Sequence, residues 1–455
     1  MSGLRVLHCL NHFLPGQPAG TEVYTWALCK ALEKQGFTSS VAIPNYEKDI
    51  AEEYEYDGLR VFKFAETSVI SKKLQMGLEA PNGVIAFRSL LQQEQPDIVH
   101  FHELAGSNGF TVHHVEAAKA LTMKTVVSFH LANASCKAGT LMYRGKKHCD
   151  GVIRKFRCSN CILSTDFPGL VGYSSAVVAL ALKNINVDLS GKESKVATAL
   201  SFPFIISRLK NKLTLLSANA DALVCIADWY KEVLLRNHIE AGKITVIRQG
   251  LADAGAFMPA SEKKYSPTLR LVFIGRVSYL KGLHLIIKAM AVLPAEKISL
   301  DIYGPGTEDD YAAECKQASA AMKNIHWKGM LQPGQAVQVI QQYDALILAS
   351  LFSEMSPLVI QEAFQAGRPV IASNVYGNAE QIVAGKNGWL FNFNDAESLT
   401  TLLTGLIHQP QRYAPENLEI KAPRKFDQLA AEYAAVYKTI TDPIAGAEGV
   451  AVLPE

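Results

Sequence analysis

The sequence predicts an α/β protein of two domains, each built on a mostly parallel sheet covered by helices. Short runs rich in β-branched residues alternate with longer segments of helical spacing, as is typical of doubly wound sheets. This alternation occurs twice, on either side of a segment rich in Gly, Pro, Ser and charge (250–268), which indicates a linker. The 455 residues are enough for two or three domains.

The strands expected in the first half lie at 5–11, 39–44, 59–64, 97–102, 124–130, 221–227 and 244–249, with an early helix over 21–35. Those expected in the second half lie at 269–275, 298–304, 324–329, 344–350, 369–373 and 388–392. We therefore expect domains at 1–252 and 265–422. A final amphipathic helix, 424–441, is expected to pack back on the first domain, and 442–455 to form a loose tail.

Composition excludes some classes of partner. The net charge is +2, from 45 basic and 43 acidic side chains, which gives no support for a broad nucleic-acid-binding face. The start lacks the pattern of a signal peptide, and no apolar run is long enough to span a bilayer. We expect a cytoplasmic protein. The most apolar region, 170–182, predicts a core or surface helix, and peripheral membrane contact is left open.

The most informative segment runs from Glu354 to Glu362. Ser356 and Pro357 are the residue types preferred at the N-cap and first position of a helix. The helix would expose the backbone N–H groups of Leu358 and Val359, which form an anion site. Glu354 lies just before this helix start, and Glu362 lies one turn inside the helix. Two carboxylates beside an anion site suit a ligand that carries a phosphate and many hydroxyls, such as a nucleotide-sugar.

A second phosphate-binding pattern follows the first strand of the second half, in FIGRVSYLKG. Gly275 permits a close turn of the backbone. The Arg276 guanidinium can bind two phosphate oxygens at once, and the Lys281 ammonium adds a point charge. The alternative is that both are solvated loop charges. Gly304, at the next strand end, suggests either a loop beside a base or ribose or a plain turn.

These segments resemble a known family. FIGRVSYLKG, SEMSPLVIQEAFQAGRPVIAS and GNAEQIVAGKNGWLF, in this order, are similar to the C-terminal half of the retaining family 4 glycosyltransferases of GT-B fold, the glycosyl transferases group 1. The first half resembles the family more loosely, through a glycine-containing first loop, VHFH and SFH. The resemblance implies two Rossmann-like domains whose parallel sheets face each other across a cleft.

The resemblance also implies roles for individual residues. Arg276 and Lys281 would hold the donor diphosphate, Glu354 the sugar hydroxyls, and Glu362 the ribose hydroxyls. The remaining donor-binding residues would be Gly20, Gly275, Gly304, Met355, Ser356, Pro357, Leu358 and Val359. His130 would support the reaction centre beside the sugar. His102 and Glu103 are expected on the acceptor side because they lie at the end of a predicted strand, with a structural role for His102 as the alternative.

The implied reaction moves a sugar from a UDP- or GDP-linked donor to a hydroxyl of a saccharide or lipid-linked saccharide, with retention of configuration. The acceptor would attack from the front face, and positioning and electrostatics would replace a protein nucleophile. No cofactor is expected, because Arg276 and Lys281 would replace a metal. The alternatives are a nucleotide-sugar epimerase or phosphorylase, or an inactive scaffold.

Four cysteines gather in one segment, 131–165, which we interpret as an insert. Cys158 and Cys161 have the C-x-x-C spacing of half a zinc site, and Cys136 and Cys149 are the other candidate ligands. Two interpretations of these four cysteines remain: they bind a structural zinc, or they are reduced thiols without a metal. The other cysteines lie in apolar runs and are expected in the core.

Overall fold

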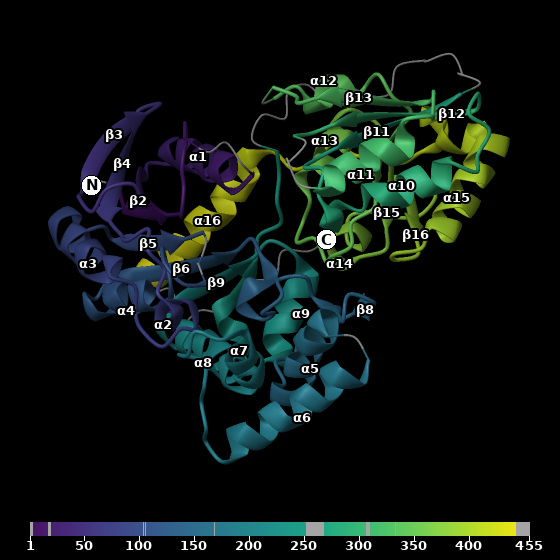
Figure 1. The fold of residues 1–455 in the computed structure, drawn as a ribbon. Helices are drawn as coiled ribbons and strands as arrows, with labels where there is room; N and C mark the ends of the chain where they lie inside the picture. The colour runs from purple at the N-terminus through teal and green to yellow at the C-terminus, as the bar shows by residue number, and fades with distance from the viewer. Residues whose placement is uncertain are drawn as a thin grey trace. The chain divides into compact units, whose positions relative to one another are not determined.

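The computed structural model describes residues 3–16, 20–102, 104, 106–167, 169–251, 268–305, 310–332 and 334–442. Nearly all of the predicted linker and tail lies outside these residues. The chain divides into two compact units, Met1–Gly139 with Asp150–Arg248 and Phe426–Glu455, and Thr140–Cys149 with Gln249–Lys425 (Figure 1). Each unit is described by itself.

The first unit contains a sheet in the order β10-β9-β6-β5-β1-β2-β4-β3. Its strands are β1 Arg5–Cys9, β2 Thr38–Asn45, β3 Glu52–Tyr56, β4 Leu59–Ala65, β5 Ile98–Phe101, β6 Lys124–Phe129, β9 Ala222–Cys225 and β10 Ile244–Val246. Every described pair is parallel except β3 with β4. The expected strands are therefore present. The edge strand β3 was not predicted, because its sequence, EEYEY, is highly charged.

Helices cover both faces of this sheet. They are α1 Gly20–Glu33, α2 Lys72–Gln75, α3 Gly83–Glu94, α4 Val112–Ala120, α5 Lys155–Asp166, α6 Leu170–Asn184, α7 Lys195–Leu200, α8 Phe202–Asn219, α9 Asp228–Arg236 and α16 Phe426–Thr441. Short 3₁₀ turns lie at η1 Ala132–Ala134 and η2 Ala241–Lys243. Ile98 and Val126 share a buried core with α1 and α16. Phe101, which alternation places on the opposite face, contacts Phe87 of α3 with ring centroids 6.2 Å apart.

Helix α16, although last in the chain, is part of the first unit's core. Tyr433 and Tyr437 are fully buried there. The Tyr24 hydroxyl of α1 donates to the Tyr433 hydroxyl at 3.1 Å. The first unit is thus completed by residues from the far end of the sequence.

The second unit contains a parallel sheet in the order β13-β12-β11-β14-β15-β16. Its strands are β11 Leu269–Ile274, β12 Ile298–Tyr303, β13 Ile325–Gly329, β14 Ala345–Leu348, β15 Val370–Ser373 and β16 Gly388–Phe391. Its helices are α10 Leu283–Met290, α11 Asp310–Ser319, α12 Ala336–Ile340, α13 Leu358–Gln365, α14 Tyr376–Ala379 and α15 Ala396–His408, with 3₁₀ turns η3 Tyr279–Lys281, η4 Pro410–Tyr413 and η5 Pro415–Asn417. Helices α10, α11 and α15 share one buried core with the sheet, and α12 and α13 share the other.

A two-stranded hairpin, β7 Met142–Tyr143 and β8 Lys147–His148, also belongs to the second unit. The backbone N–H of Ser353 donates to the Thr140 carbonyl at 2.9 Å. The Ser353 hydroxyl donates to the Met142 sulfur at 3.6 Å, and Met142 is buried. The interpretation of 131–165 as one insert of the first domain therefore needs correction. Residues 140–149 pack in the second unit, which takes up the main chain again at Gln249.

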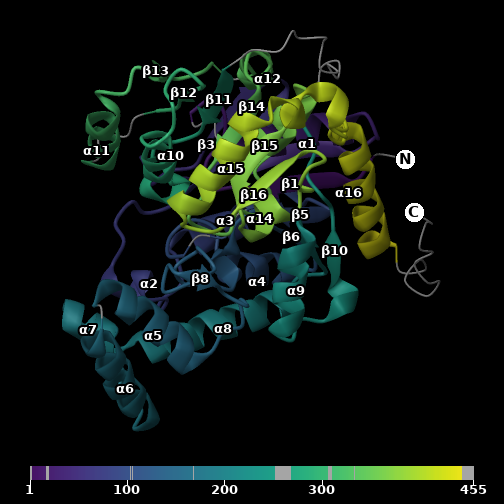
Figure 2. The same cartoon turned by 90° about the vertical axis from the view of Figure 1, so that its right-hand side faces the viewer.

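Helices α5 to α8 form a group in the first unit, and α6 lies at its outer edge (Figure 2). This helix matches the apolar region predicted over 170–182. Leu170, Val171, Tyr173, Val177 and Val178 are all at least 46% exposed, so the apolar face of α6 points to solvent. No helix of the described residues is both long and apolar enough to cross a bilayer.

Candidate functional site

Lys281 and Glu354 form the charged centre of a site in the second unit. Lys281 Nζ lies 2.6 Å from Glu354 Oε1. The Ser350 hydroxyl donates to the same oxygen at 2.7 Å. Glu354 is 8% exposed, and Nζ lies 5.2 Å from the Phe352 ring centroid. Two donors on one oxygen fix the carboxylate, and its charge is balanced by the lysine.

The amino end of α13 follows directly. Pro357, with φ −66° and ψ 119°, occupies the N-cap position, and Leu358 is the first helical residue. The helix starts one residue later than predicted, because Pro357 has an extended ψ and Ser356 makes no capping hydrogen bond. Within the described chain, the N–H groups of Leu358 and Val359 donate no hydrogen bond. These N–H groups point along the helix dipole and suit an anion.

Glu362 lies one turn inside α13. Burial raises the pKa of its carboxyl from 4.5 to about 7. Among the described residues no hydrogen bond or ion pair to this carboxyl was found. A carboxylate left without protein partners is able to accept hydrogen bonds from two neighbouring hydroxyls of a ligand.

Loops after β11 and β12 meet closely at Gly275 and Gly304. A Cβ added to Gly304 would lie 1.9 Å from the Gly275 carbonyl oxygen, so only glycine allows this approach. Arg276 is exposed, and no ion pair to its side chain was found in the described chain. The structure thus places Arg276 and Lys281 in one loop, but pairs only Lys281 with a carboxylate.

The sequence did not reveal three supports of this site. Ser350 is the last residue of the strand predicted at 344–350 and lies just beyond the observed end of β14, and this position was the available signal. Gly377 of α14 was not singled out, yet a Cβ there would lie 2.1 Å from the Glu354 carbonyl oxygen. The hairpin contact of Met142 with Ser353 joins residues 211 positions apart, and no local pattern predicts such a contact. Met355, beside them, is buried.

The remaining predicted site residues lie in the first unit. Gly20 is the exposed first residue of α1. His102 directly follows β5 and is fully buried, and His130 directly follows β6 and is 8% exposed. Glu103 lies outside the described residues.

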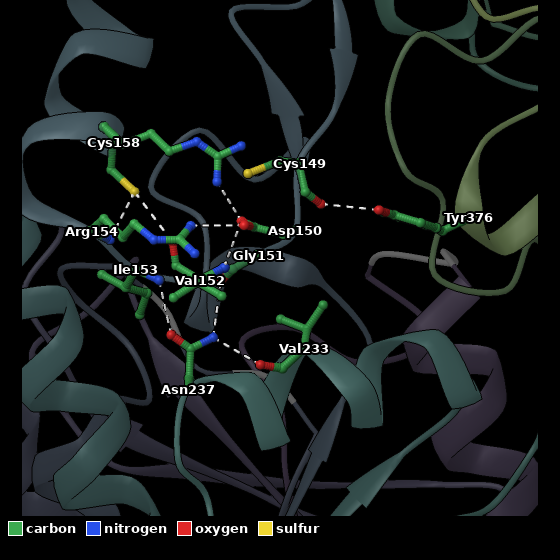
Figure 3. A network of polar contacts seen from close by, with 11 residues as sticks. Cys149, Asp150, Gly151, Val152, Ile153, Arg154, Cys158, Val233, Asn237 and Tyr376 are labelled. Atoms are coloured by element: carbon green, nitrogen blue, oxygen red, sulfur yellow. Dashed lines mark hydrogen bonds and ion pairs between the residues drawn. The ribbon is translucent and has the colours of Figure 1, made fainter.

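The predicted cysteine ligands are divided between the units. Cys149 ends the hairpin, where its carbonyl accepts a hydrogen bond from the Tyr376 hydroxyl at 3.3 Å (Figure 3). Asp150, the next residue, accepts from Arg154 at 2.7 Å and from Arg157 at 2.6 Å, both in the first unit.

Cys158 lies on α5, where its thiol donates to the Val152 carbonyl at 3.8 Å (Figure 3). Cys136, Cys158 and Cys161, all in the first unit, do not form a group with ligand atoms within 4.8 Å of one another. The zinc site stays a prediction, which metal analysis of protein purified without chelator decides.

Two family models match the chain. The model described as Glycosyl transferases group 1 matches residues 256–425. The model described as Glycosyltransferase Family 4 matches residues 18–160. The match to group 1 contains the whole Lys281, Glu354 and α13 site.

The chain is also similar to curated enzymes. It is 27% identical to glycogen synthase of Mycobacterium tuberculosis over 197 residues, covering 42% of this chain and 46% of the relative. It is 25% identical to the putative colanic acid biosynthesis glycosyltransferase WcaL of Salmonella typhimurium over 268 residues, covering 57% of this chain and 64% of the relative. The matched region thus spans less than two thirds of either relative.

Solved structures share the fold over nearly the whole chain. HepE of Anabaena, in complex with UDP-glucose, has a TM-score of 0.60 at 14% identity and covers 96% of this chain and 100% of its own. Sucrose-phosphate synthase of Thermosynechococcus elongatus has a TM-score of 0.62 at 16% identity, covering 96% and 99%. Because the two family models together match most of the sequence and the fold agrees, the chain belongs to the group 1 glycosyltransferases of GT-B fold.

Proposed function

We propose that this protein transfers a sugar from a nucleotide-sugar to a hydroxyl acceptor with retention of anomeric configuration. The observation that carries the proposal is the contact of Lys281 and Ser350 with Glu354, in the loop that leads to the unbonded N–H groups at the start of α13. Cation, carboxylate and helix terminus together match the diphosphate and hydroxyls of such a donor. Family membership supports the same activity.

The proposed site residues bind different parts of the donor. Arg276 and Lys281 face the diphosphate, and the N–H groups of Leu358 and Val359 bind its oxygens. Glu354 accepts from the sugar hydroxyls, and Glu362 accepts from the ribose. The backbone at Gly275, Gly304, Met355, Ser356 and Pro357 shapes the pocket around them.

The state of Glu354 supports front-face attack. Its Oε1 already accepts from Ser350 and pairs with Lys281, and both contacts draw electron density from the carboxylate. The engaged oxygen is thereby a weak nucleophile, while the second oxygen of the carboxylate can still accept from a hydroxyl. The acceptor hydroxyl would then attack from the side of the leaving diphosphate, which takes its proton. Arg276 and Lys281 stabilise the charge on the leaving group, the role a metal has in other transferases.

Donor and acceptor are proposed from the relatives. HepE was solved with UDP-glucose, so UDP-sugars are the first donors to test, with GDP-sugars second. WcaL is named for colanic acid biosynthesis, which favours polysaccharide or lipid-linked saccharide acceptors. Such assembly would place the protein in the cytoplasm, at the inner face of the membrane.

Helix α6 is the proposed membrane contact. Its solvent-facing residues, Leu170, Val171, Tyr173, Val177 and Val178, include no charge. Lys183 lies at its C-terminal end, and Lys192 and Lys195 are exposed just beyond. An apolar face with an aromatic residue and flanking lysines suits the interface of an anionic bilayer.

Vesicle flotation tests this contact. Wild-type protein should float with vesicles containing phosphatidylglycerol, and Val177→Asp with Val178→Asp should abolish flotation. Val292→Asp, at a more exposed valine of the second unit, is the control and should float as wild type does. Wild-type protein that stays with the soluble fraction removes the proposal.

Donor binding and turnover test the main proposal. UDP or GDP and their sugars should raise the melting temperature, because a ligand that binds only the folded state stabilises it. Release of nucleoside diphosphate should require an acceptor, which separates transfer from epimerisation, phosphorolysis and mere binding. A panel of nucleotide-sugars that leaves the melting temperature unchanged would contradict the proposal.

A further inference from the structure

Four histidines lie together inside the first unit. His8 is on β1, His100 is on β5, and His102 and His130 follow the ends of β5 and β6. Strand alternation turns all four toward the face covered by α1 and α16, and the register places His8 opposite His100. His8, His100 and His102 are fully buried, and His130 is 8% exposed.

Three of these imidazoles form a hydrogen-bonded chain. His8 Nδ1 lies 3.0 Å from His102 Nε2. His102 Nδ1 lies 3.4 Å from His130 Nε2. His102 therefore uses both ring nitrogens, and the chain ends at His8 Nε2 on one side and His130 Nδ1 on the other.

The two ends of the chain differ in environment. Among the described residues, His8 Nε2 is buried and has no hydrogen-bond partner. His130 Nδ1 also makes no hydrogen bond there, but it is absent from the buried unpaired atoms and so remains accessible. His130 lines a small cavity of about 20 Å³ together with Leu131 and Asn133.

His100 belongs to a separate network. Its Nδ1 lies 2.7 Å from the Tyr437 hydroxyl, and its Nε2 lies 2.7 Å from the Ser128 hydroxyl. His8, His100 and His102 have ligand atoms within 4.8 Å of one another, as a metal site requires. However, both ring nitrogens of His100 already take part in hydrogen bonds, and His8 and His102 are hydrogen-bonded to each other. These contacts explain the cluster without a metal.

The direction of the chain follows from its buried end. Burial lowers the pKa of His8 to about 3 and that of His130 to about 4, and it lowers the pKa of His102 as well, so each ring is neutral and carries one N–H. If the protons pointed inward, His8 Nε2 would be a buried N–H with no acceptor, which is rare and unfavourable. If the protons point outward, toward His130, His8 Nε2 carries no proton and only its lone pair is left without a partner. The hydrogen bond at one ring nitrogen determines which nitrogen carries the proton.

We propose that His8 and His102 are positioning residues that hold His130 as the Nδ1–H tautomer, so that His130 offers an N–H donor to an oxygen of the sugar substrate. The substrate side of this inference rests on the proposed function. His8 Nδ1–H donates to His102 Nε2, and His102 Nδ1–H donates to His130 Nε2. His130 then binds a hydroxyl as a donor, and the nitrogen that faces substrate cannot act as a general base.

NMR of protein labelled with ¹⁵N-histidine tests the tautomer directly, because the nitrogen shifts distinguish the protonated nitrogen of a neutral ring. At pH 7 we expect the Nδ1–H form for His8, His102 and His130, assigned by the loss of each signal in His8→Gln, His102→Gln and His130→Gln. His113→Gln, at a half-exposed histidine of α4, is the control. An Nε2–H tautomer at His130 overturns the proposal. The spectrum is recorded on the protein alone, so missing sugar transfer would count against the proposed function and leave the tautomer assignment standing.

Kinetics test the positioning role. His102→Leu removes the donor to His130 and should lower kcat by roughly tenfold with little change in donor KM, as expected for loss of an orienting partner. His102→Asn keeps an amide N–H in place of Nδ1–H and should restore most of the loss. Equal losses in the two variants, with both folded by circular dichroism, would overturn the role of His102.

Discussion

Lys281 Nζ and Glu354 Oε1 lie 2.6 Å apart in the second unit, and the Ser350 hydroxyl shares the same carboxylate oxygen. The pair joins the loop after β11 to the loop after β14 across 73 residues of sequence. Before a donor binds, the lysine already has an anionic partner. The Lys281 side chain is therefore already held in one position, and binding of a diphosphate does not have to order it.

The first prediction concerns this lysine. Lys281→Ala should lower kcat/KM for the donor roughly 10²–10³-fold, the effect of losing one electrostatic stabiliser. The variant also leaves Glu354 without its counter-ion, so donor affinity should fall as well. Steady-state kinetics with a nucleotide-sugar measure both effects.

Lys288→Ala, at an exposed lysine on α10 near the same loop, is the matched control and should behave as wild type. Unchanged turnover in Lys281→Ala would remove Lys281 from the site.

The second prediction concerns pH and Glu362. Its pKa is raised from 4.5 to about 7 by burial, so between these values the folded state binds more protons than the unfolded state. The contribution of this group to the free energy of unfolding therefore falls as pH rises from about 4.5 to 7. Glu362→Gln should be more stable than wild type at pH 8 by on the order of 1–2 kcal/mol, with no difference near pH 4.

The same substitution should weaken donor binding at pH 8, because a neutral amide is a poorer acceptor for ribose hydroxyls than a carboxylate. Thermal unfolding and titration of nucleoside diphosphate at several pH values measure the two effects. Glu314→Gln on α11 is exposed and serves as the control. A gain in stability that is independent of pH would contradict this account of Glu362.

The third prediction concerns Gly377. A Cβ at this position would lie 2.1 Å from the Glu354 carbonyl oxygen, so Gly377→Ala must displace the loop that carries Glu354. Donor affinity should fall at least tenfold, and the melting temperature should drop. Gly405→Ala on α15 adds a Cβ that would lie 3.4 Å from the nearest atom, a side-chain nitrogen of Arg412. Because alanine is favoured over glycine inside a helix, that variant should keep full donor binding and equal or higher stability. Similar losses in both variants would argue against a specific role for Gly377.

The fourth prediction concerns the hairpin. Met142 is 3% exposed and contacts Ser353, which precedes Glu354. Met142→Ala should destabilise the second unit by about 2–3 kcal/mol, as expected for truncation of a buried methionine, and should weaken donor binding. Met330→Ala, at a 70% exposed methionine of the same unit, should change neither. Chemical unfolding and donor titration compare the two. Donor binding that is normal in Met142→Ala would show that the hairpin does not support the site.

The sequence predicts the two sheets well because parallel strands buried on both faces are short, apolar runs with distinct ends. The strand ends in turn point to Lys281 and His130, and the residue types at the start of the following helix point to Glu354. What the sequence does not predict is set by contacts between distant segments. Residues 140–149 read as a continuation of the first domain, yet Leu141 and Met142 bury themselves in the second unit.

The sequence also did not predict which side chains contact one another. Arg276 and Lys281 carry the same charge in the same loop, but only Lys281 meets Glu354. His8 lies in an ordinary apolar strand, and its link to His102 depends on strand order, which no local pattern shows. Ser356 and Pro357 have suitable identities for the helix start, and the backbone angles of Pro357 shift the start by one residue.

The return of α16 to the first unit has a practical consequence for dissecting the protein. A fragment that stops at the linker would lack Tyr433 and Tyr437, and the hydrophobic surface that they cover on α1 and the sheet would be left open to water. Such a fragment should aggregate on expression, whereas one that joins residues 1–139, 150–248 and 426–442 through short flexible connections keeps that surface covered and omits the hairpin of the second unit. Separate production of the two halves therefore calls for a chain that is rewired around its discontinuous parts.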